Sequence, residues 1–482
     1  MSHLTRRQFL NRSALAAVTV SGPWLAPSRV LGANDEIRIA VIGCGVRGAG
    51  SHVPEFSRIK GVKVVAVCDP DRTRADGTAK GIKAKYGNEC DAVYDVRKLM
   101  ERKDLDVISV ATMQYWHALP TIWACQTGRH VYVEKPLSHF IWEGRQMVNA
   151  ARKYNRIVQV GTQNRSNRGY EDLGKWLKED DLGKIQYVTC CANKPRKSIG
   201  KRSEPLPIPE TLDYELWCGP ARKEPIFRDR IQYDCSFTWN MGDGESCNQG
   251  VHEIDIARWI LGYKTLPRRT MSIGGRFVFN DAGDVPNTQI LFYDYADVPI
   301  LYEIHNLPRD KSCMTPQKWN TLPDIRGMRT GVCVQCEGGY TLGTTAYDKD
   351  GKKIKSFSRG ENHFQNFINA VRSGKREELN ADVEEGHLST IITHAGNVSY
   401  RLGKPASAAE QRKQIGETPC MVEMHERLMK YLKGIEVDPD TAILGPWLEC
   451  DVKKECFKGD AKANEIAKGW YRSPFTLDEV KV

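Results

Sequence analysis

Short runs of consecutive apolar residues alternate with segments of helical periodicity in the first third of the chain. Such runs are typical of strands that are buried on both faces of a parallel sheet. They occupy residues 37–43, 62–68, 92–94, 105–111, 131–133 and 157–161. The segments between them have the length and pattern of helices, at residues 74–86, 96–101, 118–127 and 142–154. This alternation predicts an α/β fold with a doubly wound parallel sheet, of the Rossmann type, over residues 34–160.

The pattern changes after Gly161. A helix (169–179) and a strand (184–192) are followed by a long irregular stretch, residues 193–245, which is rich in Pro and Trp. Such a stretch inside a compact domain is more often a binding loop or lid than filler. Strand-like segments then follow at residues 269–279, 288–295, 299–305, 331–337 and 340–347, with a hairpin turn at 348–351 and a helix at 361–372. We predict an antiparallel α+β domain over residues 161–400 and assign no role to residues 401–482.

The composition is that of an ordinary soluble globular protein. Of the 482 residues, 40% are hydrophobic and 27% are charged, and a chain of this length holds two or three domains. The net charge of +10 is spread along the chain without a basic block, which argues against nucleic-acid binding. No apolar run reaches the ~18 residues of a membrane-spanning helix, so we expect no integral membrane association.

Residues 1–33 have the pattern of a targeting segment and not of a folded domain. The paired arginines of a twin-arginine signal occur in Thr5-Arg6-Arg7-Gln8-Phe9-Leu10, and the apolar stretch 14–20 follows them. We expect recognition by the twin-arginine (Tat) export machinery and a periplasmic or otherwise exported protein. Cleavage after Ala33 is one option, although Leu31 is a poor match to the small residue expected there.

Fifteen cysteines are scattered along the sequence. Several lie in apolar strands, such as Cys190 and Cys191, where a free cysteine behaves as a small hydrophobic residue. Cys333 and Cys336 have the spacing of a redox or zinc motif, but no second pair lies nearby. The sequence therefore assigns no metal site.

A glycine-rich loop follows the first predicted strand. Gly43-Cys44-Gly45-Val46-Arg47-Gly48 is a G-x-G-x-x-G, whose glycines permit a tight turn and close approach of the backbone to a pyrophosphate. A helix after the loop would direct its N-terminal amides at the phosphates. The second strand ends at Asp69, a position from which a carboxylate accepts hydrogen bonds from ribose hydroxyls and repels a 2′-phosphate. We predict NAD as the cofactor, and the nearby Arg72 leaves NADP as an alternative.

Lys135 stands at the carboxyl end of a predicted strand, within Val131-Tyr132-Val133-Glu134-Lys135-Pro136. Open α/β sheets bind their ligands beyond this end of the strands. A lysine there suits work as an acid or as an electrostatic clamp, because its pKa falls readily on burial. An isolated Glu-Lys-Pro is more often a solvated turn, so the functional interpretation depends on the flanking motifs.

A second segment with several candidate catalytic and binding residues runs from residue 247 to residue 262. Read as one helix, it places four polar or aromatic residues on one stripe: Asn248, His252, Asp255 and Trp259. A lone histidine on a helix is usually structural, but these polar neighbours favour a functional role for His252. Gln163 and Arg165 lie at the junction of the two predicted domains, from which side chains can reach a substrate.

Together these motifs resemble those of the Gfo/Idh/MocA (glucose–fructose oxidoreductase/inositol dehydrogenase) family. The matching positions are the glycine loop, residues 112–117, Glu134-Lys135-Pro136 and the segment around His252. Met113 stands where the family usually has proline, and Asn248 stands where many members have aspartate. The resemblance implies a large, open, mainly antiparallel sheet in the second domain, with helices on one face and oligomer contacts often on the other. It also implies a homo-oligomer and a sugar, polyol or glycoside substrate.

On this basis we predict an NAD(P)-dependent oxidoreductase that transfers a hydride between a nicotinamide and a CH–OH group. Lys135 would stabilise the developing alkoxide, His252 would take the hydroxyl proton, and Asp255 would orient the imidazole. The predicted cofactor-binding residues are Gly43, Gly45, Val46, Arg47, Gly48, Asp69, Arg72, Thr112, His117, Glu134 and Lys135. The predicted substrate-binding residues are Gln163, Arg165, Asn248 and His252.

Two other classes of function stay open at this point. In a redox-assisted glycoside-cleaving enzyme, oxidation acidifies a neighbouring C–H, elimination expels the leaving group, and the hydride is then returned. Turnover without release of NADH would distinguish it from a dehydrogenase. A non-catalytic binding protein would hold the nucleotide without exchanging hydride. An exported enzyme would also need to retain its nucleotide, and residues 193–245 or 22–36 are candidates to cover it.

Overall fold

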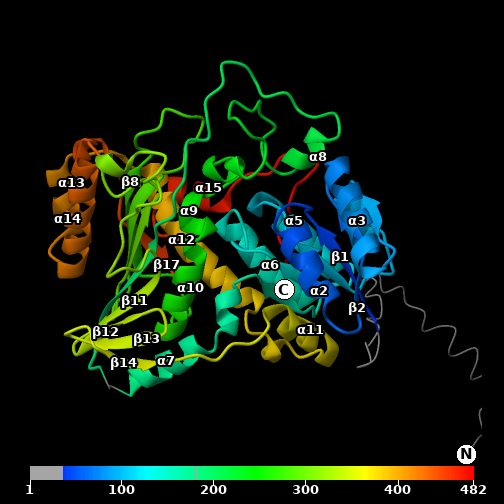
Figure 1. The fold of residues 1–482 in the computed structure, drawn as a ribbon, viewed down its shortest axis with the longest axis horizontal. Helices are drawn as coiled ribbons and strands as arrows, with labels where there is room; N and C mark the ends of the chain where they lie inside the picture. The colour runs from blue at the N-terminus through cyan, green and yellow to red at the C-terminus, as the bar shows by residue number, and fades with distance from the viewer. Residues whose placement is uncertain (1–35, 180–181) are drawn as a thin grey trace, which may run out of the picture. The chain divides into compact units, whose positions relative to one another are not determined.

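The structure is a computed structural model that describes residues 36–179 and 182–482. Its first domain contains a six-stranded, all-parallel sheet in the order β3-β2-β1-β4-β5-β6. The strands are β1 (Ile37–Ile42), β2 (Val62–Cys68), β3 (Asp91–Val93), β4 (Val107–Val110), β5 (His130–Val133) and β6 (Val158–Val160). The doubly wound sheet predicted from the alternating pattern is confirmed (Figure 1). The predicted twin-arginine segment lies outside the described residues.

Helices cover both faces of this sheet. They are α2 (Val53–Ser57), α3 (Arg72–Tyr86), α4 (Val96–Met100), α5 (Ala118–Gln126) and α6 (Ile141–Lys153). The sequence sets the ends of α3, because the Asp71 carboxylate accepts a hydrogen bond from Thr73 N and Gly87 ends the helix with a φ of 72°. A later helix, α11 (His363–Ser373), completes this core: Phe364 stacks on Tyr132 with ring centroids 4.7 Å apart.

The second domain is built on a larger sheet with the order β14-β13-β12-β11-β7-β10-β9-β8-β16-β15. Its strands are β7 (Ile185–Ala192), β8 (Arg269–Gly275), β9 (Thr288–Asp294), β10 (Ile300–His305), β11 (Thr330–Cys336), β12 (Gly339–Leu342), β13 (Thr345–Asp348), β14 (Lys353–Ser356), β15 (Lys404–Pro405) and β16 (Ile443–Leu444). Along this order only β7 and β10 run parallel, and the other neighbours are antiparallel. The predicted α+β domain with a large, mainly antiparallel sheet is confirmed.

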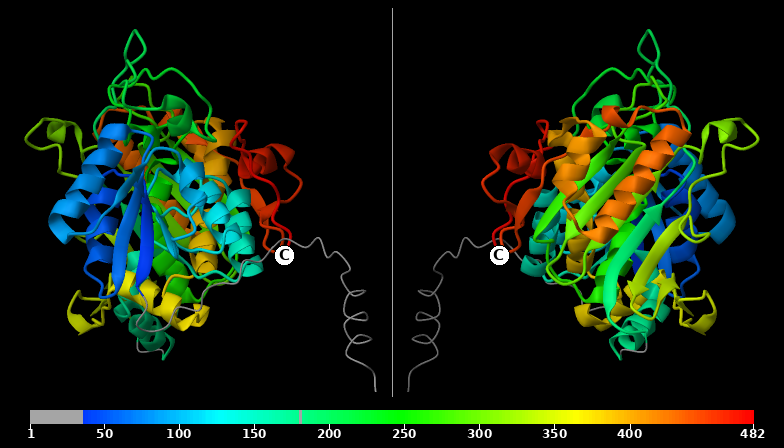
Figure 2. Two further views of the ribbon diagram at one scale, coloured as in Figure 1. Left: turned by 90° about the vertical axis from the view of Figure 1, so that its right-hand side faces the viewer. Right: turned by 90° about the vertical axis from the view of Figure 1, so that its left-hand side faces the viewer.

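Helices pack on both faces of the larger sheet. One face carries α7 (Gly169–Lys178), α10 (Gly250–Leu261) and α12 (Val383–Leu402). The opposite face carries α13 (Ala408–Ile415) and α14 (Pro419–Gly434), whose apolar side chains pack with those of β8, β9 and β10 (Figures 1 and 2). The chain's own helices thus cover part of the face for which the resemblance implies oligomer contacts. The homo-oligomer stays a prediction.

The C-terminal segment joins the two domains. It forms β17 (Leu448–Asp451), β18 (Cys456–Phe457) and α15 (Ala461–Lys468) and then runs back to the first domain. There Phe475 packs on Trp116 with ring centroids 5.3 Å apart, and Val480 N donates to Gln146 Oε1 at 2.8 Å. The end of the segment to which the sequence analysis assigns no role, 401–482, therefore helps to hold the two domains together. None of the helices in the described residues is long and apolar enough to cross a membrane.

Candidate active site

The glycine loop is shaped to leave its backbone open. Gly43 has a φ of +91°, and a Cβ there would lie 2.6 Å from Ala111 O. A Cβ on Gly48 would lie 1.7 Å from Gly43 O, so neither position accepts a side chain. A π-helical turn, η1 (Gly48–His52), and the short helix α2 follow the loop in place of a regular helix. The loop thus permits the close backbone approach that a dinucleotide pyrophosphate needs.

Asp69 lies directly beside the glycine loop. Its Oδ2 accepts a hydrogen bond from Cys44 N at 2.8 Å, and its Oδ1 accepts one from Asp71 N at 2.9 Å. Burial raises the pKa of Asp69, although both backbone hydrogen bonds and the charge of Arg74 favour the carboxylate. These contacts hold the side chain where the adenosine ribose of a dinucleotide lies in this fold.

Two arginines near Asp69, Arg72 and Arg74, differ in whether they can contact a nucleotide. The Arg72 guanidinium lies 5.0 Å from the centroid of the Tyr94 ring, which is a cation–π distance. Of the two arginines, Arg74 lines the cavity described next and Arg72 does not. Both stand in the first turn of α3, where a step of two residues turns a side chain by about 200°. Arg74, whose charge acts on Asp69, is therefore better placed at the cavity than the predicted Arg72.

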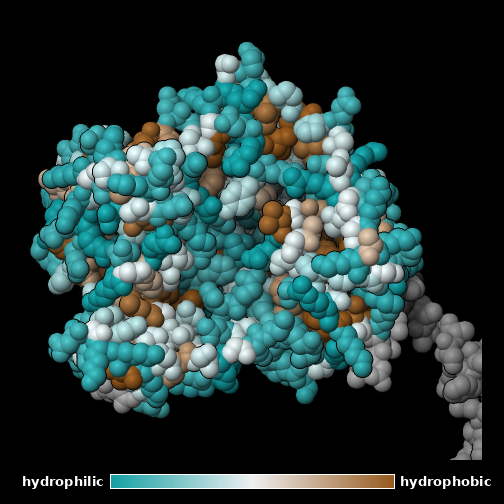
Figure 3. Space-filling view, in the orientation of Figure 1, coloured by the Kyte–Doolittle hydropathy of each residue, from teal (hydrophilic) through white to brown (hydrophobic). Residues whose placement is uncertain are grey.

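A cavity of about 790 Å³ extends from the glycine loop to the second domain, and its volume is typical of cofactor sites. Predicted cofactor residues that line its first-domain wall are Gly43, Gly45, Val46, Arg47, Asp69, Thr112, His117, Glu134 and Lys135. Lining residues from the opposite wall include Lys194, Arg196, Trp217, Gln232, Tyr233, Asn248 and His252. The sequence predicts segment 193–245 as a binding loop or lid, but it does not show which of its residues line the cavity, because the segment has no regular periodicity. The surface between the two domains is mostly hydrophilic in Figure 3.

Segment 193–245 crosses from the second domain to the first and is anchored at two places. At the adenosine end, Arg72 N donates to Thr211 O at 2.9 Å and Asp213 N donates to Pro70 O at 3.0 Å. Further along, Tyr115 OH donates to the backbone O of Trp217, in the short helix α8 (Tyr214–Cys218), at 2.7 Å. The segment thus binds next to Asp69 and next to the loop of residues 112–117.

His117 fastens that loop to the strand end that carries Lys135. Its Nδ1 lies 2.7 Å from Pro136 O, and its Nε2 lies 3.1 Å from Thr112 O. The imidazole is buried. Both ring nitrogens are therefore occupied by backbone carbonyls, so His117 shapes the cavity wall, and Thr112 presents a further lining side chain.

Glu134 lies at the centre of a buried polar cluster. His52 Nε2 lies 2.9 Å from Glu134 Oε1, Arg47 Nε lies 3.1 Å from it, and Gln163 Nε2 donates to it at 3.3 Å. Burial acts to raise the pKa of Glu134, but the hydrogen bond from His52 and the charges around it lower the pKa to about 2. The group is thus a fixed carboxylate. Gln163 contacts Glu134 and is absent from the described cavity lining, contrary to its predicted contact with substrate.

Lys135 reaches across the cavity to the second domain. Its Nζ donates to Asn248 O at 2.6 Å and lies 3.3 Å from Asn248 Oδ1. Burial lowers the pKa of Lys135, against the opposing effect of Glu134, and the charges of Arg47 and Lys194 lower it further. Lys135 is thus a buried amine held at the cavity, where it suits an acid or electrostatic role.

His252 lies on α10, and the helix that carries it differs from the prediction. The segment forms two helices, α9 (Gly244–Asn248) and α10, with a break at Gln249. Asn248 and His252 nevertheless both line the cavity. In the described part of the chain His252 Nδ1 is buried without a hydrogen-bond partner. Burial and the charge of Lys135 lower the pKa of His252 to about 3, so at neutral pH its imidazole is uncharged and keeps a lone pair.

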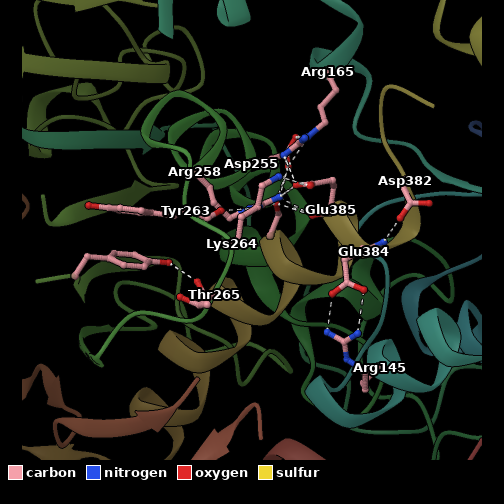
Figure 4. Close-up of polar contacts among 12 residues, drawn as sticks. Arg145, Arg165, Asp255, Arg258, Tyr263, Lys264, Thr265, Asp382, Glu384 and Glu385 are labelled. Atoms are coloured by element: carbon pink, nitrogen blue, oxygen red, sulfur yellow. Dashed lines mark hydrogen bonds and ion pairs between the residues drawn. The ribbon is translucent and has the colours of Figure 1, made fainter. Parts of the chain in front are cut away.

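Asp255 belongs to a buried ion-pair network (Figure 4). It does not orient His252 by a hydrogen bond to Nδ1, which has no partner in the described residues. Arg165 donates to it through Nε at 2.8 Å and through Nη2 at 2.9 Å, and Ser389 Oγ donates at 2.6 Å. Neither Asp255 nor Arg165 is among the described residues that line the cavity. Two buried opposite charges satisfy each other in this way, and this removes both from the roles predicted for them.

The first domain, with its glycine loop and Asp69, has the structure of an NAD-binding Rossmann domain of an oxidoreductase. Residues 37–162 match the family model "Oxidoreductase family, NAD-binding Rossmann fold", and residues 185–308 match "Oxidoreductase family, C-terminal alpha/beta domain". The two matched ranges together cover just over half of the chain. The chain belongs to the Gfo/Idh/MocA oxidoreductase family.

Curated relatives match part of the chain. Glycosyl hydrolase family 109 protein 2 of Shewanella sp. (strain ANA-3) is 34% identical over 173 residues, which cover 31% of this chain and 38% of the relative. Inositol 2-dehydrogenase 4 of Saccharopolyspora erythraea is 32% identical over 158 residues, which cover 33% of this chain and 45% of the relative. The chain thus spans less than half the length of either relative.

Among solved structures, the WlbA dehydrogenase from Bordetella pertussis in complex with NADH and UDP-GlcNAcA has a similar fold. Its TM-score is 0.53 at 18% sequence identity, and the match covers 75% of this chain and 95% of that one. At this identity the likeness concerns the fold alone, and it extends over both domains.

Proposed function

We propose that the protein transfers a hydride between NAD and a hydroxyl or carbonyl carbon of a sugar, polyol or glycoside. The observation that carries the proposal is that Lys135 and His252 both line the one cavity that begins at the glycine loop, where the charge of Lys135 acts on the imidazole. NAD, when bound, supplies the hydride acceptor and donor. The residues of this chain would place the substrate and move its proton.

Lys135 and His252 have separate tasks in this proposal. The Lys135 ammonium stabilises the alkoxide that develops as hydride leaves the carbon, an effect that is strong where water is excluded. The His252 imidazole, which lines the cavity, accepts the hydroxyl proton. Burial lowers the pKa of His252 to about 3, below the near-neutral value expected from the sequence. The imidazole is therefore uncharged at neutral pH, and its lone pair can accept the proton. The negative charges of Glu134 and Asp255 favour the imidazolium that forms.

A second candidate, redox-assisted glycoside cleavage, is favoured by the similarity to a glycosyl hydrolase family 109 protein. Oxidation of a hydroxyl to a ketone acidifies the adjacent C–H, and His252 or Lys135 removes that proton. Elimination expels the alcohol, water adds to the unsaturated product, and return of the hydride restores the hydroxyl. The sum is hydrolysis of the glycoside without net reduction of NAD.

A panel of sugars and glycosides tests both candidates on the purified protein. Nicotinamide absorbance and released alcohol are followed together for each compound. Stoichiometric NADH with intact glycoside supports the dehydrogenase. Released alcohol without accumulating NADH supports redox-assisted cleavage. Bound NAD that undergoes neither reaction with any member of the panel would contradict both and leave a binding protein.

We propose NAD in preference to NADP, on the position of Asp69. Asp69→Ser removes a charged acceptor, and such hydrogen bonds contribute about 1.5–3 kcal/mol. We therefore expect NAD to bind roughly 10- to 100-fold more weakly and the preference over NADP to fall, measured by equilibrium titration of both nucleotides. Arg74→Ala is the matched control, because it should weaken NADP and leave NAD nearly unchanged. Tighter binding of NADP than of NAD by the unaltered protein would contradict the assignment.

We also propose export through the twin-arginine route, which as generally understood carries folded proteins. An exported enzyme has no known supply of free nucleotide, so we expect about one nucleotide per chain to survive extensive dialysis of protein from its native compartment. The hydrogen bonds of segment 193–245 beside Asp69 and Tyr115 support this expectation. Protein that is empty and binds NAD weakly would contradict it and favour a cytoplasmic enzyme.

Tyr115→Phe tests whether segment 193–245 retains the nucleotide. The change removes the hydrogen bond to Trp217 O, whose net contribution of about 0.5–1.5 kcal/mol corresponds to roughly 2- to 10-fold faster nucleotide release. Tyr431→Phe is the control, because Tyr431 OH also donates to a backbone carbonyl, that of Leu307, away from the cavity. Stopped-flow displacement of bound nucleotide measures both rates, and equal rates would exclude this role.

A further inference from the structure

A compact set of metal-ligating side chains lies behind the cavity, between α9 and α12. Asp243, Cys247 and His394 each offer one ligand atom, and these atoms lie within 4.8 Å of one another. All three side chains are buried. Cys247 and His394 are 147 residues apart in the sequence, which is why local spacing gave no sign of the set.

The separations of the three ligand atoms are compatible with one ion, although the Cys247 thiol also lies within hydrogen-bond distance of Thr393 Oγ1, at 3.2 Å. His394 Nδ1 lies 3.6 Å from Cys247 Sγ and 3.9 Å from Asp243 Oδ1. The second distance is too long for a hydrogen bond. Ligand atoms around a tetrahedral zinc ion lie about 3.3–3.7 Å apart, given Zn–N and Zn–O of about 2.0–2.1 Å and Zn–S of about 2.3 Å. A small inward movement would bring all three to an ion.

The surrounding contacts have the character of an outer ligand shell. His394 Nε2 lies 2.9 Å from Ser138 O, so it carries the proton and Nδ1 directs its lone pair at the other two ligands. His139 Nδ1 lies 3.0 Å from the Asp243 carboxylate, and Asn397 Nδ2 donates to Cys247 Sγ at 3.5 Å. Metal-binding carboxylates and thiolates are oriented by such contacts.

A second observation supplies a place for a fourth ligand. A small space of about 20 Å³ is lined by two of the three residues, Asp243 and His394, and by His139 and Asn397, which is room for one water molecule. The Nε2 of His139 is buried there without a partner in the described residues. Arg401 also lines the space, but its guanidinium lies over the rings of Trp239 and Trp470, at 5.3 and 5.8 Å.

We propose that Asp243, Cys247 and His394 bind one Zn²⁺ ion, with a water molecule as the fourth ligand. A mixed sulfur, nitrogen and oxygen set in tetrahedral arrangement favours zinc over magnesium or calcium. The carboxylate of Asp243 and the thiolate of Cys247 together offset the two positive charges of the ion. The ion fastens α9 to α12 directly behind Asn248, whose carbonyl holds Lys135, and so keeps the cavity wall in place.

Elemental analysis of the purified full-length protein after dialysis against metal-free buffer tests the proposal. We expect about one zinc per chain. Zinc should be lost from Cys247→Ser and from His394→Ala and kept in Cys125→Ser, a buried cysteine of α5 away from the site. Zinc that persists in both site variants would overturn the assignment of these ligands.

A measurement on the unaltered protein makes the test independent of how the variants fold. Removal of zinc with a chelator and reconstitution with Co²⁺ should produce a thiolate-to-cobalt charge-transfer absorption, because Cys247 is a ligand. The apparent melting temperature should fall on metal removal and recover on reconstitution. Protein that is isolated without metal and shows no charge-transfer band with Co²⁺ would overturn the proposal.

Discussion

His252→Ala is expected to lower kcat by roughly 10²- to 10⁴-fold, the range measured for positioned acid–base groups. The variant removes the uncharged imidazole that lines the cavity with Lys135, whereas both ring nitrogens of the other lining histidine, His117, lie against backbone carbonyls. Nucleotide binding should be nearly unchanged, because the glycine loop and Asp69 lie on the other domain. Single-turnover reduction of NAD by an active substrate, with nucleotide affinity measured in parallel, separates the two effects.

The structure offers a closely matched control for this experiment. His305 is also buried with an unpartnered Nδ1, and burial also lowers its pKa to about 3. It packs against Tyr431, with ring centroids 4.2 Å apart, and is not among the described cavity-lining residues. His305→Gln should therefore change stability and leave kcat within a few-fold of the parent. Similar losses in both variants would mean that His252 acts through packing and not through proton transfer.

The pH dependence gives a further readout on the same residue. The folded-state pKa of about 3 lies below the usual value near 6.5, so the folded state binds fewer protons than the unfolded state between these values. The free energy of unfolding should therefore fall as the pH is lowered from about 6.5 towards 3, and less steeply in His252→Gln. The activity of the parent should show no histidine-like decline near pH 6.5, since the imidazole is already neutral there.

The fold could be predicted largely from local patterns, because those patterns have a direct physical cause. Continuous apolar runs mark strands buried on both faces, and their alternation with helices leaves few arrangements other than a parallel sheet. The glycine loop was equally readable: two of its glycines stand where a Cβ would collide with backbone. Lys135 and His252 are predictable for a similar reason: Lys135 follows a predicted strand, and His252 lies on a predicted helix.

The errors come from contacts between residues far apart in the sequence. The shared helix predicts that Asp255 orients His252, but the partner of Asp255 is Arg165, from the η3 turn (Gln163–Ser166) 90 residues earlier. A buried carboxylate binds whichever cation the tertiary fold delivers, and one sequence does not reveal that choice. The packing of α11 on the first sheet, and of the C-terminal segment on Trp116, also joins residues far apart in the sequence, and local patterns do not predict it.

Lys135→Met is expected to lower kcat by about a hundredfold or more, the scale of losing one preorganised group that stabilises transition-state charge. The methionine keeps the apolar volume of the side chain and removes the ammonium that now bonds to Asn248 O. Because that ammonium acts on charge that appears only as hydride leaves the substrate, kcat should fall more than KM rises. Equilibrium binding of NAD should stay close to that of the parent.

Lys194→Met provides the comparison that distinguishes position from charge. Lys194 lines the same cavity and also lowers the pKa of Lys135 through its charge, but it donates to Gln249 Oε1 at the far wall. If a cation anywhere in the cavity could stabilise the alkoxide, the two variants would lose similar activity. We expect the Lys194 variant to change KM more than kcat, and small alkylammonium ions to restore part of the activity of Lys135→Ala alone. Near-normal turnover by Lys135→Met would exclude the electrostatic role, and with it the mechanism proposed for this site.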